Sequence, residues 1–253
     1  EGPLNPLLAS FVSKVMGLLI GRKSTKMLEF LQSRDDFVGQ LLHHLGTSAI
    51  MDLLLRLITC IESPECRTNC MIWLNEQKLI QKLVAMIDPS CEEEKHCNAS
   101  QSLCDIIRLS REQMSQLQEK ADTDPLLAAI ESQETVTDLL NHMFSGERNE
   151  SVLVSGLAVI QTLLEFRKIG LPDFSAEGGQ EQMTLLDAER LAVGVSSTLL
   201  ALTPRLKDLN DMLVTPPKQH YSNMPTTVGT LDPPLGNVRL QISRMVATLV
   251  LTN

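Results

Sequence analysis

Apolar residues recur with helical spacing along almost the whole chain, in five stretches that resemble one another. Each begins with a small or capping residue and continues into a segment whose apolar positions repeat every three or four residues. The stretches are Leu4 to Ile20, Ser48 to Ile61, Asn98 to Ser110, Asn149 to Leu164 and Asn237 to Val250. The second, third and fourth begin about 50 residues apart, and this period predicts a helical solenoid. Solenoids bind other proteins more often than they catalyse reactions.

The repeated stretches also predict which side chains form the core. When they are aligned on their Asn residues, Leu103, Val154 and Ile242 coincide, and further apolar positions follow three and four residues later. Offsets of three and four describe a single face of a helix. We therefore expect Leu103, Ile107, Val154 and Ile242 to be almost fully buried.

A second kind of helix precedes each repeated stretch. This helix ends in a segment whose apolar residues are again three and four positions apart. The four segments are Val38 to Leu45, Leu79 to Ile87, Val136 to Phe144 and Leu206 to Val214. The unit is thus a pair of helices, with room for a short third helix, stacked about four times. This pattern predicts an all-α, armadillo/HEAT-like fold. We expect residues 1–253 to be a single helical-repeat domain that is a piece of a longer one.

Two connectors interrupt the repeat. A segment near residues 170–182 contains Gly and acidic residues, and residues 215–236 contain five Pro and show no helical period. The second is long for a loop in a compact domain, and such loops tend to be functional or disordered. The second connector keeps the apolar residues Val228, Leu231 and Leu235. We therefore expect its second half to pack against the helices, with a turn just before Asn237.

Composition narrows the possible functions. Aromatic residues make up only 3% of the chain against 43% hydrophobic residues, which favours a helical core and leaves few platforms for stacking bases. The net charge of −9 argues against nucleic-acid binding, because affinity for phosphates depends on Lys and Arg. No apolar run is long enough to span a membrane, since Asp52 and Arg56 interrupt the best candidate. We expect no nucleic-acid partner and no membrane partner.

The six Cys residues do not form a recognisable disulfide or metal motif. A long chain with many apolar residues does not need disulfides, so we expect reduced thiols and a cytoplasmic protein, with the nucleus left open. A zinc set could be drawn from Cys66, Cys70, Cys91, His96 and Cys97, but it lacks the tight C-x2-C pairs of zinc fingers. We predict no cofactor and no metal.

No combination of residues predicts catalysis. The chain has no Walker phosphate loop, no G-x-G-x-x-G, no H-E-x-x-H and no G-x-S-x-G. We therefore expect that it is not an enzyme. A helical hydrolase or metal-dependent enzyme that uses the Cys and His residues stays an alternative.

Arginines on or beside the repeated helices are the candidate partner contacts. In armadillo-type stacks the last helix of each unit lines the concave groove, so a charged side chain there can reach a partner. These arginines are Arg56, Arg108, Arg111, Arg239 and Arg244. The run Glu92 to Lys95 indicates a solvated connector or, alternatively, an acidic contact for a basic partner.

Five blocks of the sequence resemble the SAPS-domain family. They are Asn5 to Phe11, Gly46 to Leu57, Trp73 to Val84, Asn98 to Arg111 and Gly229 to Leu240, and the resemblance covers nearly the whole chain. Members of this family are regulatory subunits of protein phosphatase 6, related to yeast subunits that associate with the homologous phosphatase. The resemblance implies a domain that begins before the Asn5 block and full proteins with a long acidic tail.

The resemblance further implies a non-catalytic scaffold. Such a scaffold would hold the protein phosphatase 6 catalytic subunit and an ankyrin-repeat regulatory subunit, and would direct them to phosphoprotein substrates. No catalytic or cofactor-binding residue transfers to this chain. The alternative is a generic armadillo-type peptide-binding adaptor unrelated to phosphatases, but such grooves use arrays of Trp and Asn, and this chain has the single Trp73.

Overall fold

The computed structural model describes residues 4–116, 124–146, 148–165, 185–217 and 223–251, and almost all of its regular structure is helical. The helices are α1 (Pro6–Arg22), α2 (Ser24–Gln32), α3 (Phe37–His43), α4 (Ser48–Thr59), α5 (Pro64–Glu76), α6 (Leu79–Ala85), α7 (Glu93–Gln116), α8 (Pro125–Glu131), α9 (Gln133–Phe144), α10 (Glu150–Leu164), α11 (Leu185–Leu202), α12 (Leu206–Val214) and α13 (Asn237–Leu251). A 3-10 turn, Thr203–Arg205, precedes α12. Strands β1 (Met224–Thr226) and β2 (Gly229–Leu231) form an antiparallel hairpin before α13. The predicted all-α class is confirmed apart from this hairpin.

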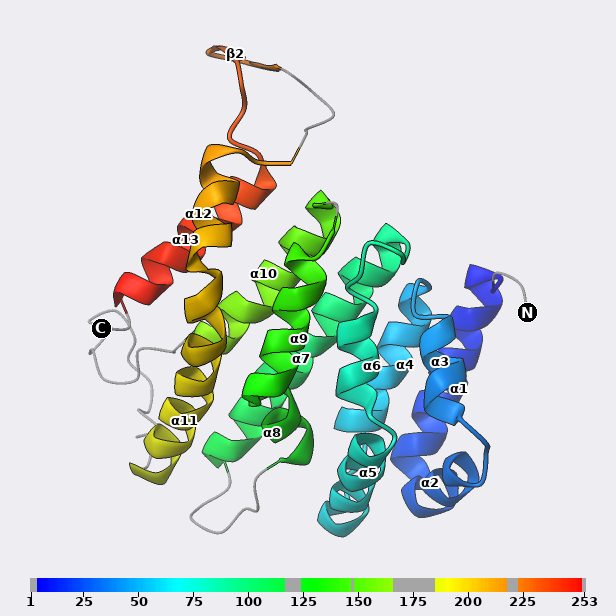
Figure 1. The fold of residues 1–253 in the computed structure, drawn as a ribbon. Coiled ribbons are helices and arrows are strands. Elements are labelled where there is room, and N and C mark those ends of the chain that lie inside the picture. Colours follow the sequence, from blue (N-terminus) through cyan, green and yellow to red (C-terminus); the bar gives the residue numbers. More distant parts are fainter. Residues whose placement is uncertain (1–3, 117–123, 147, 166–184, 218–222, 252–253) are drawn as a thin grey trace, which may run out of the picture.

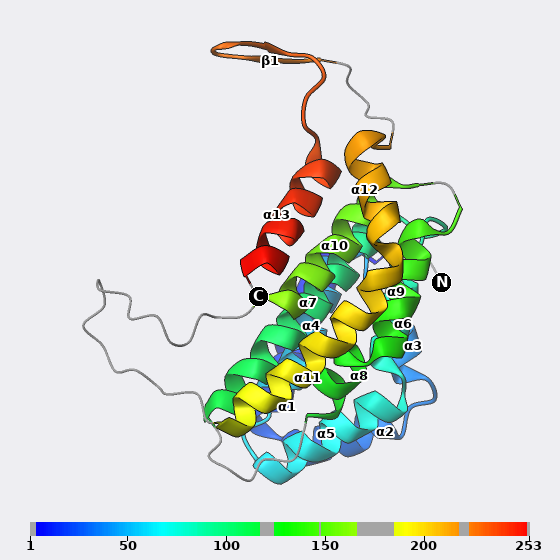
Figure 2. The ribbon, with the colours of Figure 1, turned by 60° about the vertical axis from the view of Figure 1, so that its left-hand side comes forward.

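One layer of the molecule is built from the five repeated stretches. They lie on α1, α4, α7, α10 and α13, and each of these helices packs on the next one in that order. Figure 2 shows them following one another through the stack. The inner copies therefore have a neighbour on both sides, which is how a solenoid extends a continuous core. The repeat predicted from the sequence is confirmed as an arrangement in space.

Seven of the other described helices form two further rows (Figure 1), while α12 packs on α13. Helices α2, α5, α8 and α11 contact one another in sequence, and so do α3, α6 and α9. The inner unit therefore has three helices, for example α5, α6 and α7, so the short third helix that the sequence allowed is present. The fold is an all-α solenoid. Its assignment to the armadillo or HEAT class stays a prediction.

Capping residues begin several helices. Of the predicted starts, Asn5 and Asn149 cap their helices, whereas Ser48 and Asn237 are the first residues inside α4 and α13. The side-chain oxygen of Asn5 accepts hydrogen bonds from the backbone N–H groups of the second and third residues of α1, at 3.1 and 3.2 Å. Asn149 caps α10 in the same way. Ser63 and Asp124 cap α5 and α8, each followed by Pro at the first helical position. These bonds satisfy N–H groups that have no partner inside the helix.

The helix that contains Asn98 starts earlier than its sequence suggests. Because α7 begins at Glu93, Asn98 lies inside the helix and the capping role predicted for it is wrong. Its amide donates instead to the Leu45 carbonyl, at 2.8 Å, and ties α7 to the turn before α4. The register of the repeat changes accordingly. The buried positions of α7 coincide with those of α10 when the Asn alignment is shifted by two residues.

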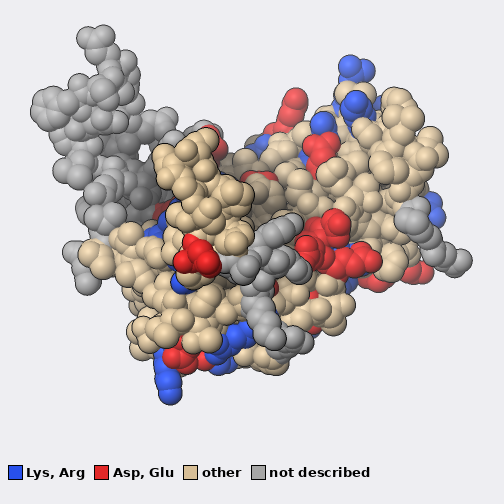
Figure 3. Space-filling model, turned by 90° about the horizontal axis from the view of Figure 1, so that it is seen from above, with Lys and Arg blue, Asp and Glu red and all other residues tan. Residues whose placement is uncertain are grey.

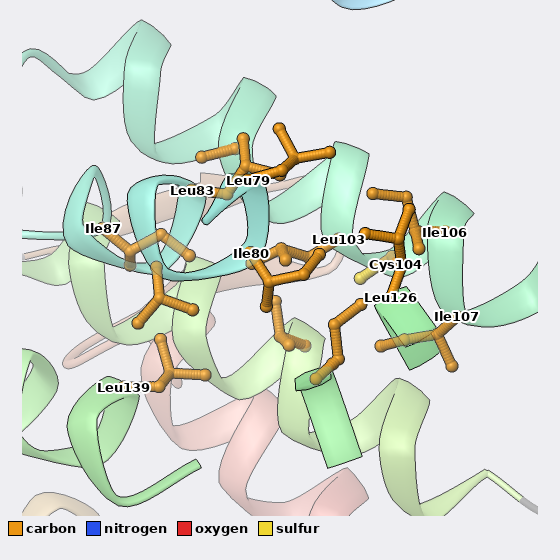
Figure 4. Close-up of a cluster of buried hydrophobic side chains, with 14 of the residues drawn as sticks. Leu79, Ile80, Leu83, Ile87, Leu103, Cys104, Ile106, Ile107, Leu126 and Leu139 are labelled. Carbon is orange, nitrogen blue, oxygen red and sulfur yellow. The ribbon is translucent and has the colours of Figure 1, made fainter. Parts of the chain in front are cut away.

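The core lies between the repeated layer and the other two rows. Figure 4 shows part of it, where apolar side chains from α6, α7, α8 and α9 meet. Leu103, Ile107 and Ile242 are at most 1% exposed, which confirms the prediction for these residues. Val154 is only partly buried, so its prediction is wrong. The two-residue shift of register places Val154 on the outer side of α10.

The connectors contain the main departures from the predicted fold. Residues 170–182 lie outside the described part of the chain. In the second connector, β1 and β2 project beyond the helices (Figures 1 and 2). The packing predicted for this segment is wrong, because its apolar side chains are exposed, up to 94% for Val228. The predicted turn before Asn237 is present, with Gly236 at a φ of 77°, a conformation that favours glycine.

Candidate protein-interaction surface

The helices of the repeated layer each carry a stripe of accessible side chains. In α7 the exposed positions Glu94, Cys97, Gln101 and Arg108, together with the partly exposed Asp105, recur every three or four residues, while most positions between them are buried. The partly exposed positions of α4 and α10 follow the same spacing. A partner lying along this layer would contact one stripe on each helix in turn.

Arg56 lies on the stripe of α4 and is held against α1. Its Nε donates to Asp52 Oδ2 at 2.8 Å, and the hydroxyl of Ser13 on α1 donates to the same oxygen at 3.2 Å. The hydrogen bond to Asp52 raises the pKa of Arg56. Gly17 of α1 lies beneath the arginine, and a Cβ at this position would be 2.6 Å from Arg56 Cδ. The absence of a side chain at Gly17 therefore lets Arg56 lie across the boundary between the two helices.

Arg108 lies on the stripe of α7 and is more accessible than Arg56, with 55% of its side chain exposed against 37%. Its guanidinium is 3.8 Å from the carboxylate of Asp105, which also accepts a hydrogen bond from Gln101 at 2.8 Å. Exposed ion pairs at such distances contribute little to stability. Arg108 is therefore available to a partner.

Arg111 has an internal role. It reaches from α7 to Glu131 on α8, at 2.9 Å, and donates to the carbonyls of Thr162 and Leu163 at the end of α10, at 3.0 and 2.9 Å. Only 19% of the Arg111 side chain and 16% of the Glu131 side chain are exposed. Burial raises the pKa of Glu131, although Arg111 opposes this effect. Arg111 thus joins three helices and supplies donors to carbonyls that a helix end leaves without partners.

Arg239 and Arg244 lie on α13, apart from the other three arginines. Arg239 donates to the carbonyls of Leu235 and Pro234, at 2.6 and 2.7 Å, and so holds the turn before α13. Arg244 is exposed. Because α10 separates α7 from α13, the five predicted arginines do not form one cluster. Partner binding by any of them stays a prediction.

The acidic run lies at the turn between α6 and α7. Glu92 is exposed, and so are Glu93 and Glu94 in the first turn of α7, where the helix dipole favours carboxylates. Figure 3 views the molecule from this end and shows acidic side chains gathered to the right of its centre. The solvated character of the run is confirmed, but most of it belongs to a helix rather than to a connector. Its contact with a basic partner stays a prediction.

A hydrogen-bonded cluster that the sequence did not reveal joins α7, α9 and α10. His142 Nδ1 is 2.8 Å from Asp88 Oδ2, and His96 Nε2 is 2.8 Å from the Asp88 carbonyl. The other ring nitrogen of His96 is 3.1 Å from the hydroxyl of Ser151. Hydrogen bonds from Ser90, and then from His142, lower the pKa of Asp88 to about 2. Asp88 and His142 are 54 residues apart, so no local pattern links them.

The Cys and His residues that were considered as zinc ligands do not lie together at one point of the fold. Within the described ranges, no group of three or more metal-ligating side chains gathers at one point. Cys66 and Cys70 lie on α5, and all six Cys are free thiols. Burial raises the pKa of Cys70 to about 12, so this thiol stays protonated at neutral pH and is a poor ligand or nucleophile. None of the described helices is long and apolar enough to cross a membrane.

The first helix exposes an apolar face. Ala9, Ser13, Gly17 and Ile20 are its buried residues, one turn apart, while the other sides are open to solvent. More than half of the side chain is exposed at Leu7, Leu8, Phe11, Val12, Val15 and Leu18. The predicted apolar patch over Leu4 to Phe11 is confirmed and extends further along the helix. Patches of this kind mark interaction surfaces.

Repeated helices with accessible stripes and an apolar end face are typical of protein-binding scaffolds. Residues 16–253 match the SAPS family, described as SIT4 phosphatase-associated protein. The chain belongs to this family, which confirms the resemblance found in the five sequence blocks.

The relatives include named phosphatase subunits. The chain is 50% identical to serine/threonine-protein phosphatase 6 regulatory subunit 1 of Homo sapiens, over 100% of this chain and 29% of that protein. It is 50% identical to regulatory subunit 2 of Homo sapiens, over 100% of this chain and 25% of that protein. It is 29% identical to extragenic suppressor of kinetochore protein 1 of Schizosaccharomyces pombe, over 99% of this chain and 29% of that protein. The chain therefore spans less than a third of the length of these relatives. No solved structure matches it significantly.

Proposed function

We propose that this chain acts as a regulatory subunit that binds the catalytic subunit of protein phosphatase 6 and directs it to phosphoprotein substrates, without catalysing a reaction itself. The observation that carries the proposal is 50% identity, along the entire chain, to proteins named as regulatory subunits of this phosphatase. Sequences this similar share their fold, and with it the arrangement of the surfaces that a partner contacts.

The proposed mechanism is tethering. A solenoid offers an extended surface on which an enzyme and a second protein can be held close together. Holding both raises the effective concentration of one for the other without any new chemistry. The chemical step then belongs to the catalytic subunit.

Three further proposals complete this picture. The three-helix unit supports an armadillo-type architecture, because that class repeats two or three helices per unit. An ankyrin-repeat regulatory subunit is a second proposed partner. The proposed location is the cytoplasm, with the nucleus as well.

The proposed contact surface for the catalytic subunit is the stripe of accessible side chains on α4 and α7. Arg56 and Arg108 carry positive charge on adjacent helices of this layer, in a chain whose net charge is −9. A cation surrounded by carboxylates helps to orient a partner protein. The cation attracts an acidic patch on the partner, and the carboxylates around it repel that patch when it docks out of position.

A binding experiment tests the proposal. The immobilised chain should retain the purified protein phosphatase 6 catalytic subunit. Replacing Arg56→Glu together with Arg108→Glu should weaken retention about tenfold, because two attractive contacts become repulsive. The matched control is Lys207→Glu, which reverses an exposed charge on α12 and should leave retention unchanged.

The outcomes separate the function from the contact surface. Retention by neither this chain nor a full-length relative would refute the regulatory role. Retention that is equal for the double variant and the control would leave the role standing and exclude the α4 and α7 stripe as the contact. Circular dichroism of each variant checks that the helices are intact.

A further inference from the structure

A groove runs between α2 and α5, toward the end of the stack opposite the β1–β2 hairpin (Figure 1). Its volume is about 470 Å³, the size of a pocket that holds a small ligand or a few side chains. Each wall is a single helix face, since its lining residues recur every three or four positions. They include Leu28 and Gln32 on α2, and Asn69, Trp73 and Glu76 on α5.

The floor of the groove is apolar. Leu28, Cys66 and Trp73 line it and are themselves buried, at 7%, 8% and 9% exposure. Ile72, on the same wall as Trp73, is 45% exposed. An accessible isoleucine beside a buried floor gains free energy when another apolar side chain covers it. The groove therefore offers a place for about one apolar side chain.

The rim of the groove is acidic. Glu29 on α2 and Glu65 and Glu76 on α5 line it, all three are exposed, and no Lys or Arg is among the lining residues. Within the described part of the chain none of the three has an ion-pair partner, in contrast to Asp52 and Glu131. Glu65 lies in the first turn of α5, where the helix dipole already favours a negative charge. Glu29 and Glu76, on opposite walls, therefore gain most from a cation placed between them.

The walls also carry amides suited to a peptide backbone. Gln32 and Asn69 line the groove from opposite helices, and both are exposed. A side-chain amide offers a donor and an acceptor at once, which matches the N–H and C=O of an extended peptide. Such bonds satisfy backbone groups that would otherwise lose water on entering the groove.

We propose that the groove between α2 and α5 binds a short segment of a partner protein in which Lys or Arg residues flank one apolar side chain. The apolar side chain packs on Ile72 and the floor, and the cations pair with Glu29 and Glu76. The charge of the rim excludes nucleic acid, because phosphates are repelled. This surface lies on the α2 and α5 row rather than on the stripe of α4 and α7, so the inference goes beyond the proposed function and does not depend on it.

Trp73 provides the readout, because it is the single Trp of the chain and lines the groove. The probe is a library of 12-residue peptides with Lys or Arg at varied positions around one Leu, Ile or Phe. Selection on the immobilised chain should enrich peptides of this class. Titration with an enriched peptide should change the Trp73 fluorescence in a saturable way, and the binding should weaken as salt is added.

Two variants assign the binding to the groove. Glu29→Gln with Glu76→Gln should raise the Kd about fourfold, since each exposed ion pair contributes about a factor of two. Ile72→Ser should raise the Kd by a similar factor while leaving the fold intact, because this side chain is accessible. The matched control is Glu93→Gln with Asp138→Asn, which removes two exposed carboxylates elsewhere and should leave the Kd unchanged.

Three results would overturn the proposal. The first is that no cationic class is enriched from the library. The second is an equal Kd for the Glu29→Gln, Glu76→Gln variant and the control. The third is concentration-dependent self-association of the chain that the same variant abolishes, which would make a second copy the occupant. Because the readout is peptide binding, its failure is distinct from failure to retain the phosphatase catalytic subunit.

Discussion

Replacing Arg111 by Met is the sharpest test of how the stack is held together. The substitution keeps much of the apolar stem but removes the guanidinium, so it leaves the carboxylate of Glu131 without its cation and two carbonyls of α10 without their donors. Breaking a buried ion pair by removing one partner costs about 3 to 5 kcal/mol. The two side chains are 19% and 16% exposed, so we expect the lower end of that range, about 3 kcal/mol.

Urea unfolding followed by circular dichroism measures this loss, and thermal unfolding gives a second estimate. In a chain of this length each kcal/mol lowers the Tm by about 2 to 4 °C, so the expected fall is about 6 to 12 °C. Arg111→Lys keeps the charge but loses the forked geometry and should cost about half as much. Arg108→Met is the matched control, because its ion pair is exposed, and should cost less than about 0.5 kcal/mol.

A double-mutant cycle isolates the pair itself. Arg111→Met combined with Glu131→Gln removes both charges and should cost less than the sum of the single substitutions, because no unpaired buried charge remains. A loss below about 1 kcal/mol for Arg111→Met, or strict additivity in the cycle, would refute the internal role of this arginine.

Two further predictions follow from the core and from the hydrogen-bonded cluster. The pKa of Asp88 is about 2, below the ordinary value of 3.8. Its contribution to the stability of the fold is therefore fully present above about pH 4 and is lost as the pH falls through 2. Because 29% of the Asp88 side chain is exposed, solvent screening reduces its contribution to the free energy of unfolding to about 1 kcal/mol. Urea unfolding of the native chain and of Asp88→Asn should differ by this amount at pH 5 and converge below pH 2, and a difference that persists there would contradict the role of the carboxylate. Leu103→Ala should lower the free energy of unfolding by about 2 to 5 kcal/mol and Val154→Ala by about 1 kcal/mol or less, since only the Leu103 substitution leaves a buried cavity. Equal losses for the two variants in urea unfolding would contradict the two-residue shift of register between α7 and α10.

The stack could be predicted from the sequence because periodicity and burial have the same cause. Each inner helix of the repeated layer must bury a wide face. The apolar residues of α7 and α10 are spaced so that they lie on that face, and the spacing can be seen in the sequence. The register could not be predicted, because Asn98 has the local signature of a helix cap. Its amide instead bonds the Leu45 carbonyl, 53 residues away, and such a tertiary contact leaves no trace in the neighbouring sequence.

The candidate site was predictable only as a set of positions. Sequence placed the arginines on the repeated helices, but their roles depend on partners far along the chain. Arg111 and Glu131 are 20 residues apart, and Arg111 and the Leu163 carbonyl are 52 apart. The groove between α2 and α5 left no motif, because its two walls belong to different helices and only their packing brings the carboxylates together.

The length and position of α7 have a mechanical consequence. This helix has 24 residues and packs against α4 and α10 in the repeated layer and against α6 and α8 in the other two rows. In a solenoid of this kind the curvature is the sum of small rotations between neighbouring units. Because α7 lies midway in the order α1, α4, α7, α10, α13, a small rotation at its contacts with α4 or α10 changes the distance between the two ends of the stack.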